Sequence, residues 1–370
     1  MDSAGRLPWG RAPWTIDFQS DPQPLAGEVD LAVVGGGLTG IAAAAWFRRM
    51  DPRKTVAVFE AETVGAGSSG HTGGLALAET AAGDLPGLGD VLAGLSKILQ
   101  ELQVSADLDL PGVWELNRTS GHSYSPIRWD DSGNLCVAQE VPGGTINPGK
   151  LVSGLARAAV ERGAMVFEHA RVENIAFEDS VLVAVCGKQV RARQVLIATN
   201  AQSLELGDLS GKAQPKFTLA LATEPLTDSQ IEALGMASRK PFYTIDLPYL
   251  WGRMLDENRI IFGSGLVHVN DWRELRAVDV ADGEAAKVLA NLKGRVRSLH
   301  TTLADVKFGH QWGGPILIAD GWRPVFRHNP SDRRGIVLGA YSGHGVALSV
   351  YLGTWAAEAI LKKRSLPSWS

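Results

Sequence analysis

A glycine-rich stretch near the start of the chain constrains the fold more than any other feature. Residues 35–40 read Gly-Gly-Gly-Leu-Thr-Gly and match G-x-G-x-x-G. The run VDLAVVGG (29–36) is short, apolar and continuous, as in a buried parallel strand. Residues 38–50 are Ala-rich and favour a helix, and TVAVFEA (55–61) gives a second strand. This order predicts a strand–turn–helix–strand unit of the Rossmann type.

Each residue of this motif has an expected role in binding a dinucleotide. Gly35 permits the tight turn, Gly37 lets a pyrophosphate approach the backbone, and Gly40 lets the helix and the strand pack closely. The helix that begins at Leu38 and Thr39 offers free N–H groups and a positive dipole end to the phosphates.

The ribose is expected to contact Glu60, which ends the second strand 20 residues after Gly40. A carboxylate at this place accepts hydrogen bonds from ribose hydroxyls and repels a 2′-phosphate. NADP is therefore disfavoured, and this unit alone does not separate FAD from NAD.

Composition excludes several classes of protein. The formal net charge of −4 argues against a general nucleic-acid binder. Cys136 and Cys186 lack metal-ligand spacing, and no other cluster supplies it, so no metal is expected. The N-terminus lacks an apolar signal segment, and the longest apolar stretch, 31–47, is short and interrupted by glycines. We therefore expect no membrane association and a cytoplasmic location.

The length of 370 residues favours two domains. Dinucleotide-type segments occur near the start, in the middle and at the end, and β-rich segments are inserted between them. We expect an α/β plus β fold, in which a Rossmann-type domain (28–110, 148–212 and 303–364) is interlaced with a β-sheet-rich substrate domain (111–147 and 213–302).

Further motifs give the chain a family resemblance. They are AGSSGHTGGL (66–75), GGTINPGKLVSGL (143–155), VLIATN (195–200), LATEPL (221–226), HQWGGPILIADGWRP (310–324) and GAYSGHGVALS (339–349). In this order the chain resembles the D-amino-acid-oxidase-like family of FAD-dependent oxidoreductases over most of 28–362, and above all its γ-glutamylputrescine oxidoreductase-like branch. The resemblance implies that the cofactor is FAD.

The resemblance also implies contacts to each part of the cofactor. Ser68, Ser69, Gly73 and Gly74 would line the pyrophosphate and flavin, Val172 would contact the adenine, Thr199 and Asn200 would close over the ribose and pyrophosphate, and Gly343, His344, Gly345 and Val346 would lie near the flavin pyrimidine. The start of the last helix also offers a positive dipole end to an anionic reduced flavin.

His71 raises a question about how the flavin is held. GHTGGL (70–75) resembles the segment of dimethylglycine and sarcosine dehydrogenases in which a histidine is bonded covalently to FAD. We expect non-covalent FAD, with a covalent link through His71 as the alternative. A loop histidine that touches flavin or solvent is the simplest interpretation.

The resemblance implies oxidation of the C–N bond of a small amine or N-substituted amino compound. A hydride passes to flavin N5, and O₂ takes the electrons to form peroxide. Two alternatives stay open: a dehydrogenase that passes electrons to a carrier or partner subunit, and a non-catalytic flavin-binding subunit. The oligomeric state is not predicted.

The substrate residues are predicted less directly. Where amino-acid-oxidising relatives carry a cation after the Gly-His-Gly turn, this chain has an apolar run, 346–348, so a carboxylate clamp is missing there. The candidates for substrate contact are His344, Arg253, Tyr249, Trp251 and Trp312. Alternating positions of a strand share one face, which would place three of them together. The alternatives are a solvent-facing arginine and core aromatics.

Overall fold

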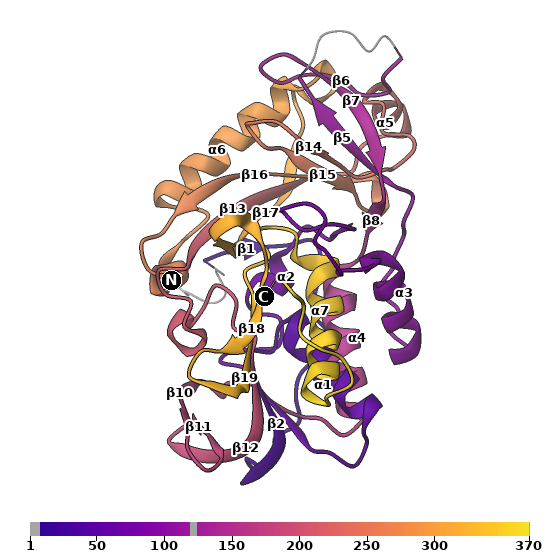
Figure 1. Cartoon of the computed structure of the whole chain (residues 1–370). Coiled ribbons are helices and arrows are strands. Elements are labelled where there is room, and N and C mark those ends of the chain that lie inside the picture. Colours follow the sequence, from indigo (N-terminus) through magenta and orange to yellow (C-terminus); the bar gives the residue numbers. More distant parts are fainter. Residues whose placement is uncertain (1–7, 119–123, 370) are drawn as a thin grey trace.

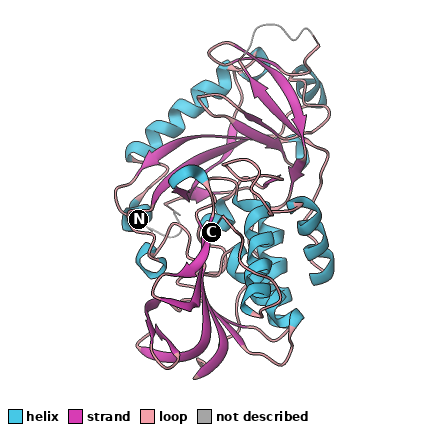
Figure 2. Cartoon of the chain, in the orientation of Figure 1, coloured by secondary structure: helices cyan, strands magenta, loops and turns pink. Residues whose placement is uncertain are grey.

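The structure is a computed structural model that describes residues 8–118 and 124–369 (Figure 1). Its described part contains a nine-stranded sheet, an eight-stranded sheet and a two-stranded ribbon of β4 (Leu75–Leu77) and β8 (Gly143–Thr145). Figure 2 shows the two large sheets one above the other, with most helices beside the lower one. The predicted α/β plus β fold is confirmed.

The eight-stranded sheet carries the Rossmann unit. β2 is parallel to both β3 and β12, and β12 is parallel to β19. The strand bounds are β2 (Glu28–Val34), β3 (Val56–Phe59), β9 (Met165–Phe167), β10 (Val172–Phe177), β11 (Val181–Val185), β12 (Lys188–Ile197), β18 (Val325–Asn329) and β19 (Asp332–Gly339). Continuous Val, Ile, Leu and Ala runs form its centre because parallel strands are covered on both faces.

Helices cover this sheet and continue to the outer face of the other sheet. α1 packs against α4 and α7, and α6 lies along β16 (Figure 1). The bounds are α1 (Leu38–Met50), α2 (Ser68–His71), α3 (Val91–Leu102), α4 (Pro148–Glu161), α5 (Asp228–Ala233), α6 (Gly283–Ser298) and α7 (Gly345–Ile360). Short 3₁₀ turns cover Leu204–Gly207, Asp256–Asn258, Trp272–Ala277, Thr301–Leu303 and Asp320–Trp322.

The nine-stranded sheet has the order β1-β17-β13-β16-β15-β14-β5-β7-β6. Its strands are β1 (Gly10–Arg11), β5 (Val113–Asn117), β6 (Arg128–Asp130), β7 (Asn134–Val141), β13 (Ala213–Thr223), β14 (Phe242–Thr244), β15 (Trp251–Met254), β16 (Ile260–His268) and β17 (Phe308–Ala319). β17 lies within 303–364, which we expected in the cofactor domain, yet it pairs with β13 along its length. Because the apolar residues of β17 pair with the similarly apolar strand β13, β17 belongs to the nine-stranded sheet.

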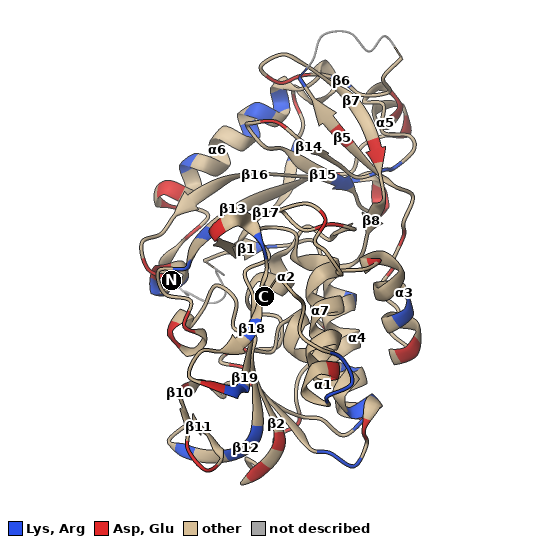
Figure 3. Ribbon diagram, in the orientation of Figure 1, with Lys and Arg blue, Asp and Glu red and all other residues tan. Residues whose placement is uncertain are grey.

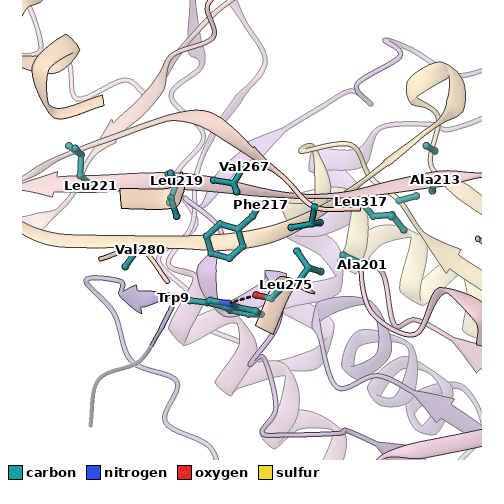
Figure 4. Packing of buried hydrophobic residues seen from close by; sticks show 14 of the residues in the cluster. Trp9, Ala201, Ala213, Phe217, Leu219, Leu221, Val267, Leu275, Val280 and Leu317 are labelled. Carbon is teal, nitrogen blue, oxygen red and sulfur yellow. Dashed lines mark hydrogen bonds between the residues drawn. The ribbon is translucent and has the colours of Figure 1, made fainter. Parts of the chain in front are cut away.

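The N-terminal arm joins the core of the upper sheet. Trp9 packs edge-on against Phe217, with ring centroids 5.6 Å apart (Figure 4). Its indole N–H donates to the carbonyl oxygen of Leu275 at 2.9 Å, so the buried ring leaves no unpaired donor. None of the described helices is both long and apolar enough to span a bilayer. The described side chains also form no His, Cys, Asp and Glu group of three or more that could hold a metal ion.

Replacing Gly353 with alanine should weaken the contact of α7 with α1. A Cβ on Gly353 would lie 2.5 Å from the backbone oxygen of Thr39, so the helices would have to separate. We expect a destabilisation of about 1–3 kcal/mol in urea denaturation.

Gly294 in α6 is the matched control, since no atom lies within 4 Å of a Cβ added there. Gly294→Ala should stabilise the protein by about 1 kcal/mol through helix propensity. Effects of the same sign at both positions would contradict close packing at Gly353.

Candidate functional site

The turn between β2 and α1 has the geometry that a dinucleotide phosphate requires. Gly35 has φ +109°, a conformation that favours glycine. A Cβ on Gly40 would lie 2.0 Å from the Gly35 oxygen, and one on Gly37 would lie 2.8 Å from the Ser69 Oγ. Gly37 is the N-cap of α1 and has no side chain to occupy the helix end. The Leu38 N–H donates to Ser69 Oγ at 2.9 Å.

A second helix begins beside this turn. The hydroxyl groups of Thr39, on α1, and Tyr341, just before α7, are hydrogen-bonded at 2.7 Å. Complete burial raises the pKa of Tyr341 above its ordinary value, so the phenol stays neutral. The pair joins the N-terminal ends of α1 and α7, whose positive dipole ends then face the same space.

Glu60 directly follows β3 and is fixed by backbone donors. Its Oε2 accepts from the N–H of Gly36 at 2.7 Å, and its Oε1 accepts from the N–H of Glu62 at 2.9 Å. Burial is the largest influence on this group and raises the pKa of Glu60. Both carboxylate oxygens keep further lone pairs, which suits them to accept ribose hydroxyls.

The short helix α2 connects the cofactor domain to the upper sheet. Ser68 Oγ donates to the Pro315 oxygen on β17 at 2.6 Å and accepts from Asn200 Nδ2 at 3.2 Å. Asn200 has φ +48°, and its Oδ1 accepts from the N–H of Ala340 at 2.9 Å. Thr199 precedes it in the same loop. Ser68 and Asn200 therefore join four chain segments, at 68, 200, 315 and 340, around the space where the resemblance would put the pyrophosphate.

His71 ends α2 and faces the same space. Its Nδ1 donates to the Gly67 oxygen at 2.9 Å. Its ring packs edge-on against Trp9, with ring centroids 5.2 Å apart. Burial lowers the pKa of His71, which favours the neutral imidazole. Trp312 is 1% exposed, and its indole N–H donates to the His71 oxygen at 3.0 Å. Trp312 thus supports α2 as well as lining the space.

The loop before α7 supplies the other side. Gly343 has φ +95°, and His344 is the N-cap of α7 without making a side-chain cap. The Nδ1 of His344 is buried and has no hydrogen-bond partner within the described structure. Burial lowers the pKa of this histidine. A buried polar atom without a partner costs free energy unless a ligand supplies one.

These residues surround a single cavity of about 1030 Å³. That volume is at the upper end of the roughly 300–1000 Å³ typical of ligand sites, which leaves room for a dinucleotide and a small substrate. All but two of the cofactor-contact residues predicted from the sequence line it: Gly35, Gly37, Leu38, Thr39, Glu60, Ser68, Ser69, His71, Gly73, Val172, Thr199, Asn200, Gly343, His344, Gly345 and Val346. The two that do not are Gly40, which lies against the Gly35 backbone, and Gly74, which lies against the Ile146 backbone oxygen.

The residues present fit FAD. The glycine turn, two helix starts without a side-chain cap from their N-cap residues, a fixed carboxylate and a buried histidine Nδ1 without a partner lie around one cavity. Val172 lies at the same end of the cavity as Glu60, since the N–H of nearby Ala170 donates to the backbone oxygen of Glu60 at 2.7 Å. The residues predicted to contact the adenine and those predicted to contact the pyrimidine therefore line the same cavity from separate chain segments.

Trp251 and Arg253 share one face of β15, as their alternation predicts. A Cβ on Gly73 would lie 2.1 Å from the Trp251 ring, and Trp251 lines the cavity. Arg253 is absent from the lining: its Nε donates to the Gly73 oxygen at 2.6 Å and its side chain is buried. Burial lowers the pKa of Arg253 to about 10. Its contacts support the 73–74 loop. Tyr249 precedes β15, lines the cavity and is 54% exposed.

The far end of the cavity is acidic, a feature that the sequence analysis missed. Glu115 on β5 is 8% exposed; it accepts from the Tyr243 hydroxyl and from Gln139 Nε2, the latter at 2.6 Å. Burial, followed by the neighbouring carboxylates Glu115 and Glu79, raises the pKa of Tyr243. Burial and Glu115 raise the pKa of Glu79 as well. An ionisable Glu inside the apolar strand VWELN (113–117) was the available signal.

This fold and site define a dinucleotide-binding oxidoreductase in which a Rossmann-type sheet and a second, nine-stranded sheet both contribute residues to one cavity. A family model described as "FAD dependent oxidoreductase" matches residues 30–359. The chain belongs to this family, which confirms the predicted family and FAD as its cofactor.

Several characterised proteins are similar to it. γ-Glutamylputrescine oxidoreductase of Escherichia coli is 26% identical over 90% of this chain and 83% of that protein. Glycine oxidase of Geobacillus kaustophilus is 25% identical over 91% and 94%. Among solved structures, that glycine oxidase superposes with a TM-score of 0.72 at 19% identity, covering 92% and 96% of the two chains. L-Proline dehydrogenase from P. horikoshii gives 0.73 at 17%, covering 93% and 96%. At these identities the structures establish the fold.

The change Glu60→Gln should weaken FAD binding. An amide keeps one acceptor oxygen but turns an NH₂ group towards a backbone N–H or a ribose hydroxyl. We expect the dissociation constant of FAD to rise about tenfold or more, as loss of a charged hydrogen bond implies. Flavin titration of the apoprotein measures it. Glu62→Gln, two residues away and half-exposed, is the control. Equal effects of the two changes would contradict a ribose contact.

Proposed function

We propose that the protein oxidises a small amine, or an N-substituted amino compound, at the carbon next to nitrogen. The acidic end of the cavity is the observation that carries this proposal. Glu79 and Glu115 line it, and the only Lys or Arg among the described lining residues is Arg171, which lies beside Val172. A substrate carboxylate would meet like charges there, whereas an ammonium group would meet opposite ones.

Two further observations support an amine over a free α-amino acid. The apolar run 346–348 leaves the start of α7 without a cation. Arg253, the other candidate for a carboxylate clamp, donates to the Gly73 oxygen and does not line the cavity. The two similar proteins are named for γ-glutamylputrescine and for glycine; both compounds contain a C–N bond, which supports oxidation next to nitrogen without distinguishing an amine from an amino acid.

When bound, FAD would supply the two-electron acceptor for the C–H bond next to nitrogen, and O₂ would be the final electron acceptor in the oxidase that we propose. The chain contributes binding, orientation and electrostatics. The start of α7 would offer its positive dipole end to the flavin pyrimidine, which the resemblance puts near residues 343–346 and where negative charge would develop on reduction. The ring of Trp251 lies over Gly73 and closes one wall against water. Glu115 and Tyr243 hold a cationic group at the opposite end.

Anaerobic mixing of the FAD-loaded enzyme with a panel of amines tests the proposal. Primary and secondary amines that lack a carboxylate should bleach the flavin faster than glycine or sarcosine does. The variant Glu115→Gln should raise the KM of the best amine about tenfold, because a buried charged hydrogen bond is lost, while kcat changes little. Glu140→Gln, on β7 and paired with Lys240, is the control for a nearby surface carboxylate.

Bleaching by no amine in the panel would contradict the proposal and favour a non-catalytic flavin-binding subunit. Admission of air then identifies the electron acceptor. Peroxide released in proportion to oxidised amine supports an oxidase. Reduced flavin that persists in air would instead show that a carrier or partner subunit takes the electrons.

We propose that the flavin is held without a covalent bond. His71 Nδ1 already donates to Gly67, and the ring is confined by Trp9. Denaturation of the yellow protein should release all flavin, and mass spectrometry should give the mass of the unmodified chain. A chain heavier by one FAD, with the added mass located on His71, would overturn this prediction.

A further inference from the structure

A second groove lies at the opposite end of the cofactor domain. It has a volume of about 1160 Å³ and is formed by three segments: Arg193 and Gln194 on β12, the β18–β19 hairpin, and the end of the chain from Ala359, in the last turn of α7, through residues 362–367 after it. It shares no lining residue with the flavin cavity. On α7, Ser349 lines the flavin cavity and Ala359 lines the groove, and this step of 10 residues corresponds to about 15 Å along the helix axis.

The groove is strongly basic. Seven Lys and Arg side chains line it, in a protein whose formal net charge is −4, and no Asp or Glu is among its described lining residues. Lys and Arg are blue in Figure 3, where they recur on β12, on β19 and after α7. The negative dipole end of α7 accounts for cations at 362–364. It does not account for Arg193, Arg327, Arg333 and Arg334, which other elements contribute.

Part of this charge is free to bind a ligand. Four of the arginines form ion pairs with carboxylates outside the lining: Arg193 with Asp30, Arg327 with Asp208, Arg334 with Asp332 and Arg364 with Glu358. The ion pairs of the described chain include none for Arg333, Lys362 or Lys363, and all three side chains are exposed. Like charges held close together are unfavourable until an anion joins them.

A histidine in the groove wall gives an independent indication of a ligand. Arg333 Nη2 lies 3.3 Å from His328 Nε2, and since arginine only donates, Nε2 accepts. The proton is then on Nδ1, which is buried and has no hydrogen-bond partner in the described structure. A donor without an acceptor, in a wall lined by cations, is complementary to an oxyanion.

We propose that this groove binds a phosphate-bearing anion with at least two negative charges. Several guanidinium groups around one groove match the geometry of phosphate oxygens better than that of a monovalent anion. The ligand is either a soluble phosphate compound or the headgroup of an anionic lipid, since both present the same chemistry to the groove. The proposal does not depend on the reaction at the flavin.

The test uses the FAD-loaded enzyme, because FAD then occupies the other phosphate site. Sodium pyrophosphate is titrated calorimetrically, and flotation is measured with phosphatidylcholine vesicles that contain or lack phosphatidic acid, whose phosphomonoester can carry two negative charges. Saturable pyrophosphate binding supports a soluble ligand. Flotation only with phosphatidic acid supports a lipid headgroup. The absence of both overturns the proposal.

The double variant Arg333→Gln, Lys362→Gln should weaken the observed binding about tenfold or more, as loss of two charged hydrogen bonds implies. The double variant Lys287→Gln, Lys307→Gln removes the same charge from exposed positions of the upper domain and should change binding less than twofold. If both double variants weaken binding equally, binding depends on net charge alone, and the proposed site is overturned. Flavin content and the melting temperature confirm that each variant is folded.

Discussion

The close approach of backbone at the starts of α1 and α7 is the constraint on which the site depends. Gly40 lies against the Gly35 oxygen, and Gly353 lies against the Thr39 oxygen, at distances that a Cβ would not allow. The Thr39–Tyr341 hydrogen bond then holds the two helix starts together. Because each start carries a positive dipole end, the sheet edge presents two anion-binding positions to one cavity. A dinucleotide with a pyrophosphate and an electron-accepting ring is the ligand that uses both.

Local sequence patterns were sufficient to predict this half of the molecule. The glycine turn, the buried strand before it and the acidic end of the next strand lie within 33 residues, 28–60, and each follows from short-range chemistry. Glu60 is fixed by Gly36 and Glu62, its neighbours in this unit. The family resemblance added His71 and the loop before α7, which local patterns alone would not have assigned to the cavity.

The substrate half could not be predicted in the same way, because its contacts join distant segments. Glu115 and Tyr243 are 128 residues apart and meet only because β5 and β14 are parallel neighbours. Arg253 has the alternation expected of a pocket residue, yet its guanidinium is held by the Gly73 oxygen, a contact 180 residues apart in sequence. β17 was grouped with the cofactor domain by its position in the chain, whereas pairing with β13 decides its sheet.

Burial of charge distinguishes the two ends of the cavity chemically. Glu115 is 8% exposed and accepts hydrogen bonds from neutral groups alone. Burial of such a carboxylate costs free energy, which a cationic ligand would offset. Arg253 does not neutralise this carboxylate, since its Nε donates to the backbone carbonyl of Gly73 rather than to Glu79 or Glu115. The basic groove lies beyond the far end of α7. A cation approaching the protein is therefore repelled from one end of the cofactor domain and attracted to the carboxylates at the reactive end. Under the proposed function, this charge separation would select against a free carboxylate on the substrate before any contact with the flavin is made.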